Sequence, residues 1–124
     1  MHLQVSNVCK SFGRGSNAKL VLDQVSFSLE SGDFKALVGS SGSGKSTVMR
    51  LVAGLDQPSS GVITMDGQSV RGPGSDRGMV FQKYSLYPWL TAGENVAFGM
   101  LLQGRSKQEV RERTSYFLDV VGLA

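Results

Sequence analysis

Gly39-Ser40-Ser41-Gly42-Ser43-Gly44-Lys45-Ser46-Thr47 is the stretch that decides the fold of this 124-residue chain. It satisfies every position of the pattern G-x-x-x-x-G-K-[ST], in which a glycine-rich loop binds phosphate groups. Such a loop requires a buried strand before it and a helix after it. The apolar run from Phe34 to Val38 predicts the strand. The helix is predicted by apolar residues that recur at the spacing of one helix face packed on a sheet, namely Val48, Leu51, Val52 and Leu55.

The residue types of the loop suit the binding of a phosphate chain. Unpaired backbone N–H groups and the positive dipole end at a helix N-terminus both favour an anion. Gly39, Gly42 and Gly44 have no Cβ, so the backbone can approach closely and adopt positive φ angles. Lys45 would supply a charge for the β and γ phosphates, and Ser46 a hydroxyl for Mg²⁺. The alternative, a flexible Gly/Ser linker, requires neither Lys45-Ser46 nor the flanking patterns.

Composition limits the classes of function. With 40% hydrophobic and 19% charged residues, the chain suffices for one modest domain. Its net charge of +3 is too mild to indicate nucleic acid, and the phosphates of a nucleotide are sufficient anionic partners. The single cysteine, Cys9, excludes an internal disulfide and fits a reducing compartment. No apolar run approaches the roughly 18 residues that span a bilayer, so we expect membrane association only through a partner.

The patterns on either side of the loop predict antiparallel strands. Leu3 and Val5 alternate with polar residues, as do Val25, Phe27 and Leu29, and a polar loop from Gly13 to Lys19 separates the two runs. Val62–Met65 predicts a strand, and Asp66-Gly67 is a strong hairpin signal. We therefore interpret Asp66 as a turn residue and not as a magnesium ligand.

The second half of the chain begins with another predicted strand, Met79-Val80-Phe81, followed by Gln82. A glutamine directly after such a strand can reach a ligand at the carboxyl edge of a sheet. The segment Tyr84–Leu90 is aromatic but contains Pro88, which disfavours a regular helix there; the segment lines the core or forms an exposed partner patch. Capping-box spacing in Thr91–Glu94 and Ser106–Glu109 predicts helices over about 92–103 and 107–121.

These motifs resemble the nucleotide-binding subunits of ABC transporters, over about residues 3–123. Met79–Gln82 looks like the family's glutamine-loop strand, and Leu90–Val96 like the entry into its helical subdomain. Pro73–Gln82 with Pro88–Thr91 is similar to the branch that imports nitrate, sulfonate and taurine. The implied fold is α/β: an incomplete P-loop NTPase core (34–58 and 73–83), an N-terminal antiparallel β subdomain (1–33 and 60–72) and the start of a helical subdomain (84–124).

The resemblance also implies roles for particular residues. Phe12, which on pattern alone reads as a core or edge-strand aromatic, would stack on adenine. Gly39–Thr47 would hold the phosphates of ATP and Mg²⁺, with Lys45 contributing to catalysis, Ser46 to the metal, and Gln82 sensing the metal and the attacking water. Tyr84–Leu90 would help to receive a transmembrane permease subunit, and a second ATP-binding subunit would complete a dimer. The protein would then lie peripherally on the cytoplasmic face of the cell membrane and couple ATP to the uptake of a small anion.

Some parts of the family pattern are absent from the 124 residues. The sequence has no LSGGQ-type signature and no apolar strand ending in Asp-Glu, and its one histidine, His2, cannot be the switch residue. Because phosphoryl transfer needs a positioned water and a fixed metal, we expect this N-terminal part to bind ATP without hydrolysing it alone, and to be marginally stable. A non-catalytic remnant that binds ATP or a permease is the alternative. An unrelated P-loop kinase or GTPase is disfavoured by the Gln82 region and by the antiparallel strands.

Overall fold

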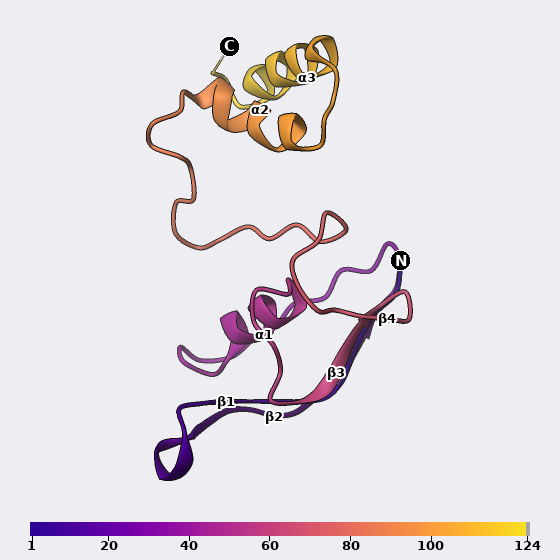
Figure 1. Ribbon diagram of the computed structural model, residues 1–124, viewed down its shortest axis with the longest axis vertical. Coiled ribbons are helices and arrows are strands. Elements are labelled where there is room, and N and C mark those ends of the chain that lie inside the picture. Colours follow the sequence, from indigo (N-terminus) through magenta and orange to yellow (C-terminus); the bar gives the residue numbers. More distant parts are fainter. Residues whose placement is uncertain (124) are drawn as a thin grey trace. The chain divides into compact units, whose positions relative to one another are not determined.

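A computed structural model describes residues 1–123 as two compact units, the first ending at Val80 and the second beginning at Phe81 (Figure 1). The first unit contains, in chain order, β1 (Leu3–Phe12), the short 3-10 helix η1 (Gly15–Asn17), β2 (Lys19–Leu29), α1 (Lys45–Val52), β3 (Ser60–Met65) and β4 (Gln68–Ser69). The second contains α2 (Ala92–Leu102) and α3 (Lys107–Val120). Within residues 1–123, no helix combines the length and the apolar character needed to cross a membrane.

The strands of the first unit form one antiparallel sheet in the order β2-β1-β3-β4. The central strand β1 pairs on both sides: Val5 lies opposite Phe27 of β2 and opposite Ile63 of β3. The pairing of β1 with β2 is interrupted by register shifts, close to which Asn7 and Gln24 both have a φ of 47°. The alternation of apolar and polar residues therefore predicted the antiparallel strands correctly.

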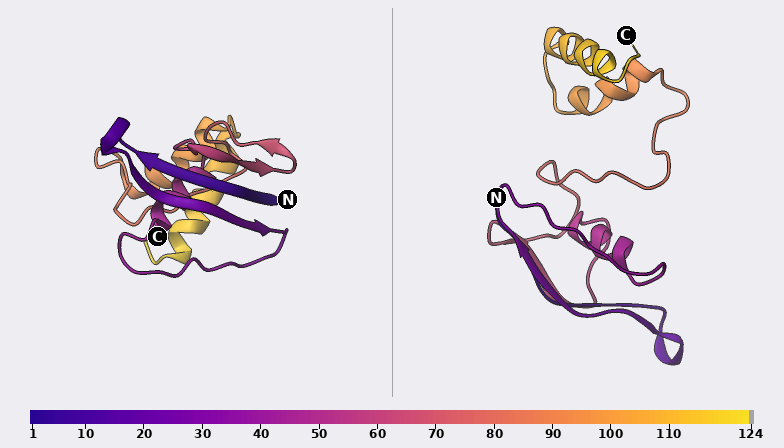
Figure 2. Two further views of the ribbon diagram at one scale, coloured as in Figure 1. Left: turned by 90° about the horizontal axis from the view of Figure 1, so that it is seen from below. Right: turned by 180° about the vertical axis from the view of Figure 1, so that it is seen from behind.

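The β3–β4 hairpin turns through Asp66 and Gly67, as the sequence predicted (Figure 2). Both residues have positive φ angles, 49° and 80°, which is the requirement of a two-residue type I′ turn. The Asp66 carboxylate accepts a hydrogen bond from the backbone N–H of His2 at 2.6 Å. Its role in this structure is to tie the turn to the start of β1, which confirms the interpretation of Asp66 as a turn residue.

Helix α1 covers one face of the sheet (Figure 1). Val48 and Leu51 are buried in the core and Val52 packs against it, whereas Leu55 is 39% exposed beyond the helix end. Gly54 has a φ of 76° and donates to Leu51, and Leu55 donates to Arg50, which is the Schellman pattern of a helix C-terminus. The core is formed by apolar residues of the sheet and of α1, together with Val70: Leu3, Val5, Val8, Leu22, Val48, Leu51, Ile63, Met65 and Val70.

Two predicted strands do not form. Residues 34–38 and 79–81 have irregular backbone, and Val38 and Val80 are 93% and 99% exposed. A buried parallel strand requires hydrogen-bonding partners beside it. Within residues 1–123 the only sheet is the antiparallel one, and neither segment pairs with it. The apolar runs therefore have strand composition but lack the neighbours that would make them strands.

The second unit consists of α2 packed against α3 and an irregular aromatic segment before α2. The predicted capping box at α2 is complete, with the Thr91 side chain accepting from the Glu94 N–H and the Glu94 carboxylate accepting from the Thr91 N–H. At α3 only half of the box is present: Ser106 accepts from the Glu109 N–H, but the Glu109 carboxylate pairs with Arg105. Val110 is the buried residue of α3.

Candidate nucleotide-binding site

The glycine-rich loop leads directly into the N-terminus of α1. Ser43 donates to the carbonyl of Ser40 at 3.2 Å, which closes a turn, and Gly44 is the N-cap residue of the helix. Gly42 and Gly44 have φ angles of 78° and 98°, in the left-handed region that favours glycine. The first backbone N–H groups of α1 have no acceptor within the helix, because helix geometry leaves them unpaired. The loop therefore presents a set of backbone donors suited to an anion.

The Lys45 ammonium group lies against this loop. It donates to the carbonyl oxygens of Gly39 and Ser40, both at 2.7 Å, and to the Ser43 hydroxyl at 3.3 Å. Lys45 is the first residue of α1, so its position is fixed at one end by the helix and at the other by the loop. This geometry places a cation within the same short segment as the backbone donors.

The three glycines of the pattern are required for different reasons. A Cβ on Gly39 would lie 2.6 Å from the Ser43 hydroxyl oxygen, so it would fill the turn. A Cβ on Gly44 would lie 2.7 Å from the Leu22 side chain and 3.2 Å from the Val21 carbonyl oxygen, because the helix start rests on β2. Gly42 has open space around it and needs only its positive φ. A cradle without side chains, lined by N–H donors and a lysine, fits a phosphate chain.

The other predicted ligands differ in exposure. Ser46 is exposed in the first turn of α1, and Thr47 is half-buried, as are Lys45 and Gly44. Ser40 and Ser41 are exposed in the loop. Among residues 1–123, no group of three or more His, Cys, Asp or Glu side chains could hold a metal ion. A metal at this loop would therefore depend on isolated protein groups such as the Ser46 hydroxyl and on oxygens that the nucleotide supplies.

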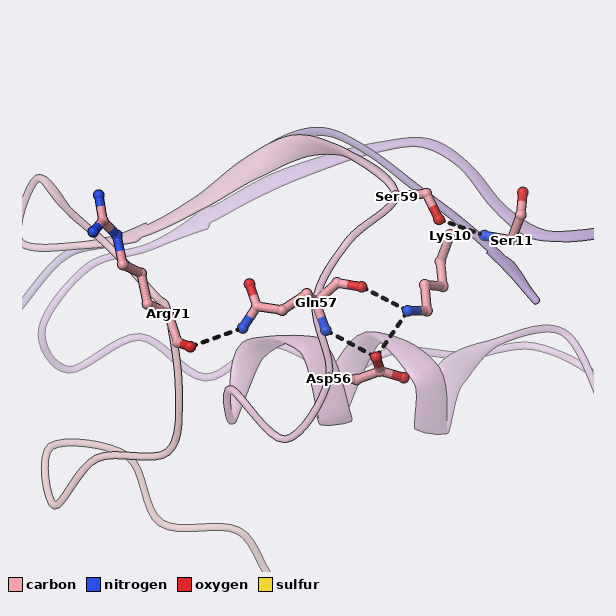
Figure 3. A network of polar contacts seen from close by, with 6 residues as sticks. All are labelled: Lys10, Ser11, Asp56, Gln57, Ser59 and Arg71. Atoms are coloured by element: carbon pink, nitrogen blue, oxygen red, sulfur yellow. Dashed lines mark hydrogen bonds and ion pairs between the residues drawn. The ribbon is translucent and has the colours of Figure 1, made fainter. Parts of the chain in front are cut away.

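Phe12 is the last residue of β1 and is 46% exposed, so it is a strand-end aromatic and not a core residue. The Lys10 ammonium lies 5.0 Å from the centre of its ring. Lys10 also donates to the Asp56 carboxylate at 2.8 Å and to the Gln57 carbonyl at 2.6 Å (Figure 3). The hydrogen bond from Lys10 holds the pKa of the Asp56 carboxyl below its usual value. Sequence reasoning missed this pair because its members are 46 residues apart with no shared motif.

Gln82 belongs to the second unit, whereas the phosphate loop belongs to the first. It follows Phe81 in an irregular and exposed segment, not at the end of a strand. The sequence placed Gln82 at the carboxyl edge of a sheet, and that expectation fails together with the strand at 79–81.

The segment Tyr84–Leu90 is exposed, with Tyr84, Leu86 and Trp89 among its most accessible side chains. Tyr87 anchors it by packing on Phe98 and Trp89, with ring centres 4.7 and 5.3 Å away. The Asn95 side chain fixes the backbone: it accepts from the Tyr87 N–H and donates to the Tyr87 and Leu90 carbonyls. Of the two roles left open by the sequence, the surface patch is the one observed for Tyr84, Leu86 and Trp89. The sequence alone did not identify this role of Asn95, because its hydrogen bonds to the backbone depend on how the segment folds.

Comparison with known proteins identifies the family. The model of the ABC transporter family matches residues 22–123. The nitrate import ATP-binding protein NrtD of Synechocystis sp. is 52% identical over 123 residues, which cover 99% of this chain and 46% of that protein. The taurine import ATP-binding protein TauB of Sinorhizobium fredii is 42% identical over 120 residues, which cover 97% of this chain and 45% of that protein. The chain thus spans slightly less than half the length of these relatives.

Solved structures give the same result for the fold. The dimeric post-hydrolysis structure of the ATP-binding cassette MJ0796 bound to ADP and Pi superposes with a TM-score of 0.81 at 30% identity, covering 94% of this chain and 56% of that one. A second dimeric structure of MJ0796, described as a bacterial ABC transporter cassette, gives a TM-score of 0.79 at 32% identity. The α/β fold expected from the sequence is therefore that of part of an ATP-binding cassette. On the evidence of a family match over residues 22–123, this chain belongs to the ABC transporter family.

Proposed function

We propose that this chain binds MgATP at the Gly39–Thr47 loop and serves as the nucleotide-binding part of an ABC importer ATPase. The observation that carries the proposal is the position of the Lys45 ammonium, 2.7 Å from two carbonyls of the loop that ends at the N-terminus of α1. Cation, backbone donors and helix dipole all belong to one short segment, and each favours an anion. A chain of linked phosphates is the ligand that uses all three.

Each residue of the segment has a distinct task in this proposal. The N–H groups of Gly42 and of Gly44 to Thr47 donate to phosphate oxygens, and Lys45 neutralises their charge. The Ser46 hydroxyl, exposed in the first turn of α1, is a ligand for Mg²⁺. The exposed ring of Phe12 offers an aromatic face on which adenine stacks. When bound, Mg²⁺ neutralises charge on the phosphates and helps to orient them.

The transported solute is proposed from the relatives. NrtD and TauB are named for the import of nitrate and of taurine, so we assign this chain to the uptake of a small anion of that kind. Tyr84–Leu90 is the surface for a transmembrane permease subunit, since its exposed aromatic residues have the composition of interface centres. A second ATP-binding subunit forms a dimer, as in the MJ0796 structures, and the assembly lies on the cytoplasmic face of the membrane.

Hydrolysis requires more than the residues of this chain provide. A positioned water, a fixed metal and neutralised γ-phosphate charge must be present together. In this proposal Lys45 neutralises charge on the phosphates, and Ser46 contributes a ligand to the metal. Among the residues that the structure describes, no group of three or more His, Cys, Asp or Glu side chains could hold a metal ion. We propose that these residues bind and orient ATP, and that turnover requires groups beyond the 124 residues.

Calorimetric titration of the chain with MgATP tests the proposal. We expect Lys45→Ala to weaken binding at least about tenfold, because it removes a charged partner of the phosphates. Lys35→Ala is the matched control, since Lys35 is an exposed lysine four residues before the first glycine of the loop. Equal affinities for MgATP in wild type and Lys45→Ala would overturn the proposal. Preference for GTP over ATP in competition would favour a different class of P-loop protein.

A further inference from the structure

A polar network outside the phosphate loop connects the end of β1 to the segment that follows α1 (Figure 3). Its centre is Lys10, whose side chain is only 12% exposed. The Lys10 ammonium donates to Asp56 at 2.8 Å and to the Gln57 carbonyl at 2.6 Å. Gln57 in turn donates to the Arg71 carbonyl at 3.0 Å, and Ser59 accepts from the Ser11 N–H at 3.0 Å. Lys10 is therefore a fixed cation and not a mobile surface lysine.

The Lys10 ammonium also lies over the ring of Phe12, 5.0 Å from its centre. This distance is within the range in which a cation is attracted to an aromatic face. An ammonium group has three N–H donors, and two of them are engaged by Asp56 and Gln57. One face of Phe12 is thus occupied by Lys10, while the side chain as a whole is 46% exposed.

Asp56 connects this arrangement to the phosphate loop. It lies two residues after Gly54 in the turn that follows α1, and α1 begins at Lys45 of the loop. Helix α1, its C-terminal turn and the Lys10–Asp56 ion pair thus connect the phosphate loop to Phe12. A nucleotide that binds through both its phosphates and its base needs this connection, because the distance between the phosphate loop and Phe12 must match the length of the ligand.

We propose that Lys10, held by Asp56, is a positioning residue that orients the Phe12 ring for stacking on the base. The inference rests on the proposed function, in which Phe12 stacks on adenine. Lys10 does not touch the nucleotide in this account. Lys10 contacts the face of the Phe12 ring opposite to the one on which the base stacks. This contact fixes the position of the ring relative to the phosphate loop.

The test compares two ligands that differ in the base. MgATP and Mg-tripolyphosphate share the phosphate chain, but only ATP has a base that can stack. We would measure both dissociation constants by calorimetry for wild type, Lys10→Met, Lys10→Arg, Asp56→Asn and Phe12→Ala, all as the full chain. The ratio of the two constants is the readout. A fraction of unfolded protein lowers both apparent affinities alike, so the ratio does not report stability.

We expect Lys10→Met to reduce the preference for ATP by roughly two- to fivefold, which is the effect of losing one cation–π contact and its restraint on the ring. Asp56→Asn is expected to act in the same direction. Lys10→Arg should retain most of the preference, since a guanidinium can pair with Asp56 and lie on the ring. In the double variant Lys10→Met/Phe12→Ala the loss should equal that of Phe12→Ala alone, because Lys10 acts through the ring.

Three outcomes would overturn the inference. If Lys10→Met weakens ATP and tripolyphosphate equally, Lys10 acts as a general charge. If Phe12→Ala lowers the preference for ATP but Lys10→Met does not, stacking stands and the positioning role fails. If Phe12→Ala leaves the preference unchanged, the stacking role in the proposed function fails and the role of Lys10 fails with it.

Discussion

The ammonium nitrogen of Lys45 lies 2.7 Å from the carbonyl oxygen of Gly39, six residues earlier in the chain. This contact spans the whole glycine-rich loop, and the hydrogen bonds to Ser40 and Ser43 lie within it. The lysine that would neutralise phosphate charge therefore also holds the loop in shape. Loss of Lys45 would affect both the charge and the arrangement of the backbone donors.

The glycines of the loop offer a matched pair of substitutions. Gly44→Ala would place a methyl group 2.7 Å from the Leu22 side chain at a φ of 98°, whereas Gly42→Ala meets nothing within 4 Å at a φ of 78°. We expect Gly44→Ala to lower the free energy of unfolding by about 2 to 4 kcal/mol, and Gly42→Ala by about 1 to 2 kcal/mol from backbone strain alone. Urea titration measures both. Equal losses would contradict the contact between the helix start and β2.

The packing of α1 on the sheet predicts a large effect at Leu51. This side chain is 2% exposed, so Leu51→Ala would leave a cavity in the core and lower the free energy of unfolding by about 2 to 5 kcal/mol. Met49 lies on the same helix but is 47% exposed, and Met49→Ala should change the free energy of unfolding by less than about 0.5 kcal/mol. Chemical denaturation monitored by circular dichroism checks both. A similar cost for the two variants would show that α1 is not seated on the sheet.

The capping box at α2 makes that helix sensitive to acid. Hydrogen bonds from the Thr91 backbone N–H and then from its hydroxyl hold the pKa of Glu94 below its ordinary value. A depressed carboxyl pKa in the folded state contributes stability that is present above the unfolded pKa and is lost as the pH falls through the folded one. We therefore expect helix content near α2 to decline as the pH falls below the ordinary pKa of a glutamate carboxyl. The decline should be smaller in Glu94→Gln, and an unchanged acid profile in that variant would contradict the role of the box.

Asn95 is predicted to hold the aromatic segment Tyr84–Leu90. Its side chain bonds to the backbone of Tyr87 in both directions, at 2.8 and 3.2 Å. Asn95→Ala should release the segment, shift Trp89 fluorescence and speed proteolysis between residues 84 and 90, since unpaired backbone groups open to solvent. Gln108→Ala, which removes only an exposed contact to Glu112 on α3, is the control. Unchanged Trp89 emission and proteolysis in Asn95→Ala would refute this role.

Apart from the antiparallel strands, the features that the sequence predicted correctly are local ones. Thr91 and Glu94, or Asp66 and Gly67, are close in the chain, so their geometry follows from short-range hydrogen bonding and backbone sterics. The phosphate loop is of the same kind, because Lys45 bonds to residues no more than six positions away. The features that were wrong or were missed depend on distant partners. The apolar runs at 34–38 and 79–81 have no neighbouring strands, and the Lys10–Asp56 pair joins residues that share no motif.

The central claim, that the backbone of Gly39–Thr47 binds the phosphates of MgATP, is tested most directly by following the amide resonances of the loop. The measurement is a titration of the ¹⁵N-labelled chain with MgATP, observed by two-dimensional NMR. We expect the amides of Gly42, Gly44, Lys45 and Ser46 to shift strongly and to saturate with one affinity, while amides of the β3–β4 hairpin stay in place. Tripolyphosphate should shift the same loop amides. Shifts elsewhere in the chain with the loop amides unchanged would contradict the account.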